Sequence, residues 1–278
     1  MTYRDIWRRI AAAYGDGEAR AVARVLLEDG YGMSYADIIS GAAERLGGED
    51  AARLEADVRR LEKGEPVQYV TGRADFMGRT FRVGPGVLVP RPETEQLCAL
   101  VAEALPHDGK GKHILDIGTG SGCIAATLAL DVEGAHVTAW DISADALETA
   151  RSNAARLGAE VDFRQQDALC PPDDNCVWDA VVSNPPYICA EERSGMDCNV
   201  LDYEPALALF VPDDDPLVFY RSIARYAAHS LKPGGTLAFE INRRFAAETE
   251  QMLRAEGFGD VHTVKDIFGN YRNTICRR

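Results

Sequence analysis

From about residue 96 onward, the hydrophobic positions alternate between two periods. Short apolar runs typical of buried strands are separated by longer segments in which apolar residues recur every three or four positions, as in amphipathic helices. Strands are predicted at 113–117, 136–141, 161–165, 180–183, 236–241, 261–265 and 273–276, and the helices between them include 143–157, 217–231 and 245–256. This alternation predicts an α/β fold with a mostly parallel, doubly wound, seven-stranded sheet. A short Gly-Asn turn joins the last two strands, so one of them is expected to run antiparallel.

Two other patterns precede this region. Residues 1–65 have apolar residues at helical spacing with glycines between them, which predicts a small helical bundle, and Ser34 is typical of an N-cap. In residues 66–95, β-branched and aromatic residues alternate between glycines, which favours a β-hairpin linker over a helix. The domains predicted are therefore 1–65, 66–95 and 96–278. The bundle is either a stabilising appendage or a docking surface for a macromolecule, and the sequence leaves both open.

The charge of the chain restricts the classes of partner. The 278 residues include 30 Lys and Arg and 44 Asp and Glu, a net charge of −14, and duplex nucleic acid is usually held by clustered basic residues. No uncharged apolar run of about 18 residues is present, and the charged N-terminal segment is unlike a signal peptide, so a cytoplasmic protein without a membrane anchor is expected. Seven cysteines without metal-binding spacing predict buried, reduced thiols and no metal site.

A glycine-rich turn follows the first predicted strand and begins a helix. Backbone N–H groups at such a turn can face a ligand without intervening side chains, which predicts a nucleotide-like ligand. Cys123 stands where the dinucleotide fingerprint has its third glycine, so NAD is disfavoured, and no Lys-Ser or Lys-Thr follows as in a triphosphate-binding loop. The residues expected at this ligand are Asp116, Gly118, Thr119, Gly120, Ser121 and Gly122.

Two carboxylates end the next two strands. Asp141 is expected at the carboxyl edge of the sheet, where it can accept hydrogen bonds from both hydroxyls of a ribose. The alternative is an N-cap for the helix that begins near Ser143, although Ser143 can cap that helix itself. Asp167 follows the third strand in the same relative place, and it is either a second ligand contact or a loop carboxylate.

The fourth strand of this region ends in Asn184-Pro185-Pro186-Tyr187. The two prolines cannot continue a sheet ladder, and they fix the backbone so that the Asn184 carboxamide and the Pro185 carbonyl can point into a cleft. Two fixed acceptors can bind both hydrogens of one planar NH₂ group, align its lone pair and stabilise positive charge that develops on the nitrogen. Tyr187 can stack over the planar group.

Together these residues resemble the class I S-adenosylmethionine-dependent methyltransferases over about residues 96–278, and the Asn-Pro-Pro-Tyr tetrapeptide resembles the subset that methylates planar amino nitrogens. The segments 65–72 (EPVQYVTG) and 89–95 (VPRPETE) are similar to the release-factor protein-(glutamine-N5) methyltransferases. A sister family that acts on a ribosomal protein typically has Ser-Pro where this chain has Pro92-Glu93-Thr94-Glu95. With the helical N-terminal region included, the resemblance covers nearly the whole chain.

The resemblance implies a Rossmann-like methyltransferase fold, S-adenosylmethionine as cofactor with S-adenosylhomocysteine as product, and the glutamine of the Gly-Gly-Gln loop of peptide chain release factors as substrate. Asp167 is then expected at the adenine amino group, and Ala168 stands where the family often has an aromatic residue against the adenine. Arg91 and Glu93 either contact the substrate or brace the hairpin. The alternative activity is methylation of an adenine or guanine amino group in nucleic acid. The residues expected at the reacting amide, with Asn184 also next to the cofactor, are Arg91, Glu93, Asn184, Pro185, Pro186 and Tyr187.

Overall fold

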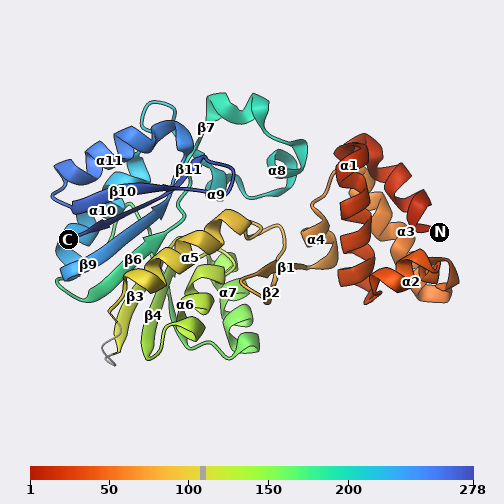
Figure 1. Cartoon of the computed structure of the whole chain (residues 1–278), viewed down its shortest axis with the longest axis horizontal. Helices are drawn as coiled ribbons and strands as arrows, with labels where there is room; N and C mark the ends of the chain where they lie inside the picture. Colours follow the sequence, from red (N-terminus) through yellow and green to blue (C-terminus); the bar gives the residue numbers. More distant parts are fainter. Residues whose placement is uncertain (107–110) are drawn as a thin grey trace. The chain divides into compact units, whose positions relative to one another are not determined.

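The computed structural model describes residues 1–106 and 111–278, and the chain divides into two compact units (Figure 1). The smaller unit consists of Met1–Ala74, Val83–Pro85 and Met196–Glu204, and the larger unit consists of Asp75–Arg82, Gly86–Gly195 and Pro205–Arg278. Within the described ranges, no helix combines the length and the apolar composition needed to cross a membrane.

The smaller unit is helical, as the sequence predicts. It contains α1 (Tyr3–Tyr31), α2 (Tyr35–Ile39), η1 (Ala42–Arg45), α3 (Gly48–Glu62), α4 (Val67–Thr71) and α8 (Cys198–Tyr203). The non-helical backbone of Gly15 (φ 73°, ψ 158°) interrupts α1 with a kink, as expected for a glycine between two helical segments. Ser34 is the N-cap of α2 and forms a capping box with Asp37. The core of this unit is apolar and includes Ile6, Ile10, Leu26 and Leu54.

Only part of the segment 66–95 forms the β-hairpin that the sequence predicts. The hairpin is confined to β1 (Arg73–Phe76) and β2 (Arg79–Arg82); α4 precedes it, and α5 begins at Pro92. In α4, burial of Val67, Tyr69 and Val70 outweighs the β preference of these residue types. In addition, the segment Met196–Glu204, predicted as part of 96–278, belongs to the smaller unit, where the Tyr203 hydroxyl donates to the Lys63 carbonyl oxygen at 3.1 Å.

The larger unit is built on a seven-stranded sheet. In sheet order the strands are β10 (Gly259–Lys265), β11 (Tyr271–Arg277), β9 (Leu231–Glu240), β6 (Trp178–Ser183), β3 (Lys112–Ile117), β4 (Ala135–Asp141) and β5 (Val161–Gln165). All neighbours from β9 to β5 are parallel, and β11 is antiparallel to both β9 and β10. The predicted seven-stranded sheet is confirmed, and one of the last two strands, β11, is antiparallel as expected; it lies between β9 and the edge strand β10.

Helices cover both faces of this sheet (Figure 1). They are α5 (Pro92–Ala104), α6 (Cys123–Asp131) and α7 (Ala144–Leu157) on one face, and α10 (Val218–Ser230) and α11 (Ala246–Ala255) on the other. Shorter elements in the connections are β7 (Ile188–Cys189), η2 (Ala190–Gly195), α9 (Ala206–Leu209), β8 (Phe210–Val211) and η3 (Arg243–Phe245). Each face of the sheet is therefore buried in its own apolar core, as expected for a doubly wound fold.

The strand order places a crevice at one edge of the sheet. β3 pairs with β4 on one side and with β6 on the other, so the connections that follow β3 and β6 diverge to opposite faces. Ligands of such sheets bind outside the carboxyl ends of the strands at this point.

The cysteines are only partly as predicted: all seven are free thiols, but Cys170, Cys176 and Cys198 are exposed rather than buried.

Candidate functional site

A cavity of about 260 Å³ lies at the carboxyl ends of β3, β4, β5 and β6 within the larger unit. The predicted residues that line it lie up to 95 positions apart in the sequence, from Arg91 to Pro186. The predicted residues that line it are Arg91, Gly118, Thr119, Gly120, Ser121, Asp141, Asp167, Asn184, Pro185 and Pro186. Further lining residues, to which the sequence analysis assigned no site role, include Val87, Leu88, Val89, Thr94, Ile142, Leu169, Leu207 and Phe219.

The glycine-rich turn has the backbone conformation that its composition predicts. Gly118 (φ 77°) and Gly120 (φ 54°) are in the left-handed region, and a Cβ at Gly120 would meet nothing within 4 Å. The amides of Gly118 and Thr119 both donate to the Trp140 carbonyl oxygen at 2.9 Å. Hydrogen bonds to β4 therefore hold the turn in place, and the space next to the Gly120 Cα is open to a ligand.

Asp141 connects this turn to the start of α7. One carboxylate oxygen accepts from the Gly120 amide and the other from the Ser143 amide, both at 2.9 Å. Ser143 is itself the N-cap of α7, because its hydroxyl accepts from the Ala146 amide. Burial raises the pKa of Asp141, while the backbone hydrogen bonds act in the opposite direction. Each oxygen keeps acceptor capacity toward the cavity, as a ribose ligand requires.

Asp116 and Gly122 do not line the cavity. Asp116 is fully buried below the turn, where it accepts from the Thr119 hydroxyl at 2.6 Å, and burial raises its pKa to about 7. Gly122 (φ 79°) packs against α7, and a Cβ there would lie 2.9 Å from the Ala150 Cβ. Both residues thus support the turn from within the protein.

Asp167 forms a turn of its own at the cavity. One of its carboxylate oxygens accepts from the Leu169 amide at 2.8 Å, and Asp167 remains only half-buried. Ile142, Leu169 and Leu207 are 45%, 43% and 60% exposed although they are large and apolar. Because all three line the cavity, they offer apolar surface that a flat ring could cover.

The Asn184–Tyr187 segment begins where β6 ends. The Asn184 side-chain nitrogen Nδ2 donates to the Thr94 hydroxyl at 3.4 Å, and Pro185 and Pro186 line the cavity beside it. Tyr187 lies outside the cavity lining because its hydroxyl turns to Glu240 and donates to Oε1 at 3.0 Å. Burial raises the pKa of the Tyr187 hydroxyl strongly, so Tyr187 stays protonated and remains a donor.

Two buried polar residues on β9 and after it support this segment. Glu240, 1% exposed, also accepts from the Thr94 hydroxyl at 2.6 Å, and burial raises the pKa of its carboxyl group. Asn242 donates to the Tyr187 carbonyl oxygen at 3.0 Å and to Glu192 at 2.8 Å. Glu93 lies outside the cavity lining, in the first turn of α5. The sequence analysis assigned no site role to Thr94, Glu240 or Asn242, although Glu240 is a polar residue next to the end of a predicted strand.

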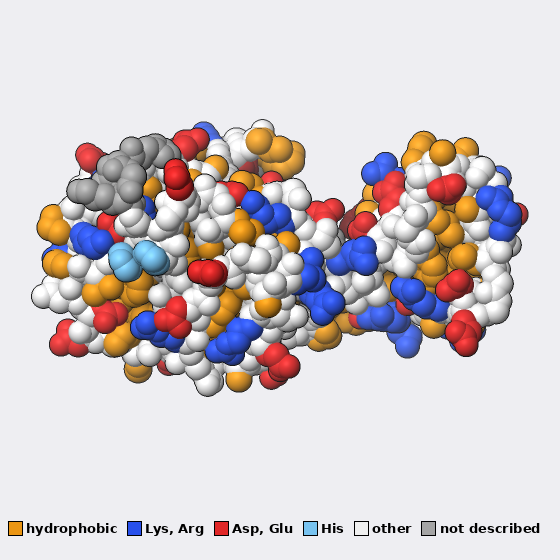
Figure 2. Space-filling view, turned by 90° about the horizontal axis from the view of Figure 1, so that it is seen from below, with side chains coloured by type: hydrophobic (Ala, Val, Ile, Leu, Met, Phe, Trp, Pro, Cys, Tyr) orange, Lys and Arg blue, Asp and Glu red, His pale blue; other side chains and the backbone are white. Residues whose placement is uncertain are grey.

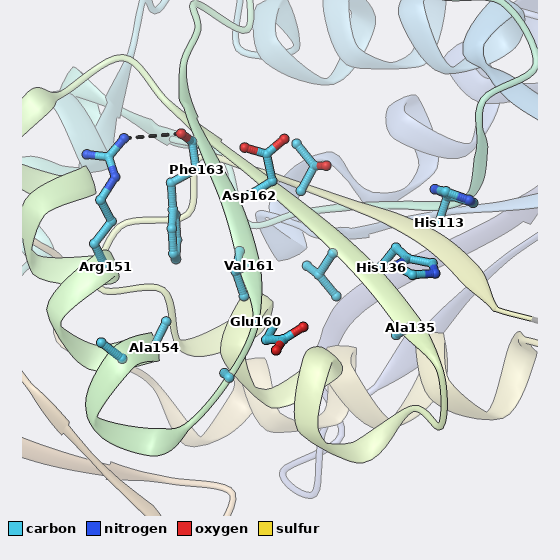
Figure 3. Close-up of a pocket in the computed structure, with 13 residues that line it drawn as sticks. His113, Ala135, His136, Arg151, Ala154, Glu160, Val161, Asp162 and Phe163 are labelled. Atoms are coloured by element: carbon cyan, nitrogen blue, oxygen red, sulfur yellow. Dashed lines mark hydrogen bonds between the residues drawn. The ribbon is translucent and has the colours of Figure 1, made fainter.

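A second, larger hollow of about 650 Å³ lies near the amino ends of β3 and β4 (Figure 3). His113 and His136 stack there with 5.1 Å between ring centroids, and Arg151 donates to the Phe163 carbonyl oxygen. Ten of the predicted site residues line the smaller cavity, and none lines the larger hollow.

Comparisons with known proteins give matches over most of the chain. The family described as methyltransferase small domain matches residues 80–198, and the PrmC N-terminal domain matches residues 4–72. The chain is 45% identical over 266 residues to the release factor glutamine methyltransferase of Bacteroides thetaiotaomicron, covering 95% of each chain. It is 38% identical to that of Bacillus subtilis, covering 94% of this chain and 91% of the relative.

Among solved structures, a methyltransferase from Pyrococcus furiosus is similar to this chain with a TM-score of 0.52 and 18% identity. The similarity covers 82% of this chain and 97% of the other. At this identity the likeness shows the fold alone, which is the seven-stranded methyltransferase sheet.

The position of Gly122 generates a prediction about stability. We expect Gly122→Ala to lower the free energy of unfolding by about 1–3 kcal/mol more than Gly158→Ala, measured by urea denaturation. Both glycines have positive φ, but Gly158 has nothing within 4 Å of a Cβ, so it controls for the backbone conformation alone. Equal losses in the two variants would show that contact with Ala150 is not what requires glycine at position 122.

Proposed function

The chain belongs to the release factor glutamine methyltransferase family, and on this premise we propose that it transfers a methyl group from S-adenosylmethionine to a glutamine side-chain nitrogen (N5) in peptide chain release factors. The glutamine proposed is that of the Gly-Gly-Gln loop. One observation carries the proposal: the acceptors at Asn184 and Pro185 line the same cavity as the glycine-rich turn and Asp141. A nucleoside-type ligand and a planar amide can therefore meet in one cavity.

The residues present fit S-adenosylmethionine. The open space above Gly120 accommodates close approach of a ligand to the backbone, and the carboxylate of Asp141 can still accept hydrogen bonds from ribose hydroxyls. Apolar surface for the adenine is available at Ile142 and Leu169, with Asp167 beside them for its amino group. The cofactor supplies an electrophilic methyl group on a sulfonium, which is already a good leaving group.

The protein's part in the reaction is positioning and electrostatics. The Asn184 carboxamide oxygen and the Pro185 carbonyl would accept from the two N–H groups of the glutamine amide. Such contacts hold the planar nitrogen in place and stabilise the positive charge that develops on it during transfer. The stack proposed for Tyr187 would use the face of its ring, because its hydroxyl is engaged with Glu240.

Charge favours a protein substrate over duplex nucleic acid. The net charge is −14, and in the larger unit Lys and Arg side chains are interspersed with Asp and Glu on the face seen in Figure 2. Phosphate recognition depends on clustered basic side chains, so this distribution favours the protein-methylating reading.

We further propose that the N-terminal helical unit docks the release factor. An amide alone offers too little surface to distinguish one glutamine from the others in the cell, so binding must come from remote contacts. Residues 1–65 contain ten Lys and Arg and thirteen Asp and Glu, a nearly balanced charge that favours apolar docking. Tyr35 and Ile39, one turn apart on α2, are 58% and 62% exposed and supply such a surface.

The direct test is mass spectrometry of a release factor after incubation with the protein and S-adenosylmethionine. We expect one added methyl group on the glutamine of the Gly-Gly-Gln loop, and none on a release factor in which that residue is replaced by Glu. Efficient labelling of DNA or RNA in place of the release factor would contradict the proposed substrate class.

Replacement of Asp141 tests the cofactor site. We expect Asp141→Ala to weaken S-adenosylhomocysteine binding by about 1–3 kcal/mol in isothermal titration, because charge-assisted hydrogen bonds to the ribose are lost. Asp145→Ala is the matched control, since Asp145 is exposed on α7 and does not line the cavity. Unchanged affinity in Asp141→Ala would remove the ribose role from this residue.

Replacement of Asn184 tests the amide acceptors. We expect Asn184→Ala to lower the single-turnover rate of methyl transfer about 10²- to 10³-fold at saturating cofactor, because one preorganised acceptor is lost in the transition state. Cofactor affinity, measured in parallel, should change little. A rate within about threefold of the wild type would refute the acceptor role.

The docking surface has its own prediction. We expect the double variant Tyr35→Ala/Ile39→Ala to lower kcat/KM for the intact release factor about tenfold or more, because apolar docking contacts are lost, while leaving the low activity on a short Gly-Gly-Gln peptide unchanged. Leu130→Ala, which removes an exposed leucine from α6, is the control. An unaltered kcat/KM for the intact protein would assign these side chains no part in docking.

A further inference from the structure

The two ends of the Asn184 carboxamide have opposite hydrogen-bonding character. Its oxygen can accept from the NH₂ group of a substrate amide, whereas its own NH₂ group would face that substrate donor to donor. The side chain therefore works as an acceptor in only one of its two orientations. The orientation is determined by the hydrogen-bond partner of the Asn184 NH₂ group, which is Thr94.

A chain of hydrogen bonds runs from Asn184 through Thr94 to the buried carboxylate of Glu240. Asn184 Nδ2 donates to Thr94 Oγ1 at 3.4 Å, and Thr94 Oγ1 donates to Glu240 Oε2 at 2.6 Å. The other carboxylate oxygen, Oε1, accepts from the Tyr187 hydroxyl at 3.0 Å. Thr94 and Glu240 are 2% and 1% exposed, so water has little access to replace either link.

The direction of this chain follows from the donors and acceptors available. An ionised Glu240 can only accept, so the Thr94 hydroxyl hydrogen is directed toward it. The Thr94 oxygen is then left as an acceptor, and the Asn184 group that can face it is the NH₂ group. Burial raises the pKa of Glu240, and the negative charge of Glu93 raises it further. Hydrogen bonds from Thr94 and Tyr187 and the positive charge of Arg272 lower this pKa and favour the ionised form.

We propose that Thr94 and Glu240 are positioning residues that hold the Asn184 carboxamide with its oxygen toward the cavity and anchor Tyr187 on the same carboxylate. The proposal rests on the amide-methylating function proposed above, which gives the orientation its use. Glu240 does not line the cavity and acts through Thr94 and Tyr187. One carboxylate at the end of β9 thus determines which end of the Asn184 carboxamide faces the cavity, and it also binds the Tyr187 hydroxyl.

Three variants test this arrangement by kinetics. Thr94→Val removes the hydroxyl at nearly constant volume. In Glu240→Gln the new NH₂ group can donate to the Thr94 hydroxyl, so that this hydroxyl can donate to the Asn184 carboxamide oxygen. We expect each variant to lower the single-turnover rate of glutamine methylation about tenfold or more while cofactor affinity stays within about threefold. Thr94→Ser should restore the rate to within about threefold of the wild type. Thr249→Val is the matched control, because Thr249 is also buried and its hydroxyl has no hydrogen-bond partner among the described residues.

The double variant distinguishes positioning from general damage. If Thr94 and Glu240 act through one chain, Thr94→Val/Glu240→Gln should lose no more activity than the more impaired single variant. Multiplied losses would overturn the shared role. A rate for Thr94→Val within about threefold of the wild type would overturn the positioning role of Thr94.

A spectroscopic measurement decides the inference even if the wild-type protein methylates no release factor. The side-chain NH₂ signals of Asn184 in a ¹⁵N–¹H spectrum can be identified by their absence in Asn184→Asp. We expect these signals to shift in Thr94→Val and Glu240→Gln and to stay in place in Thr249→Val. Signals that do not respond to Thr94→Val would overturn the inference, whereas an inactive wild type with responsive signals would contradict only the proposed function.

Discussion

The parallel pairing of β3 with β4 on one side and β6 on the other is the constraint on which the site depends. Because all three strands point the same way, the residues that follow Ile117, Trp140 and Ser183 emerge at one edge of the sheet. Hydrogen bonds then fix the emerging segments to one another, as when Gly118 donates to the Trp140 carbonyl and the Ser183 hydroxyl donates to the Ile117 carbonyl. The geometry of the cavity is therefore set by the sheet, and its chemistry by the side chains that follow each strand.

The sheet could be predicted from sequence because buried strands and amphipathic helices have distinct periods. Each of the seven strands overlaps the apolar run that predicted it, although β9 begins at Leu231, five residues earlier than expected. Shorter elements were less predictable. The helix α4 consists of residue types that favour strands, and only its burial in the helical unit makes it helical. The assignment of 196–204 to that unit depends on contacts between distant parts of the chain, such as Tyr203 with Lys63, which no local pattern contains.

At the site, the predictable part was the set of polar residues and glycines that follow strands. Gly118, Asp141 and Asn184 all line the cavity. The sequence could not show which members of a motif face inward: Asp116 turns to Thr119 below the loop, and Tyr187 turns to Glu240. Thr94 could not be predicted for another reason. It lies on α5, and its partner Glu240 on β9 is 146 positions away in the sequence, so no local pattern shows that the two side chains meet.

The helical unit is assembled from Met1–Ala74, Val83–Pro85 and Met196–Glu204, so it is discontinuous along the chain. A gene fusion or recombination event with a single crossover near position 74 would transfer the first segment and leave the other two with the recipient. The transplanted bundle would then have to recover contacts such as Tyr203 with Lys63 from a foreign sequence. This architecture favours inheritance of the two units together, and it limits the modular shuffling by which other enzymes have acquired new recognition domains.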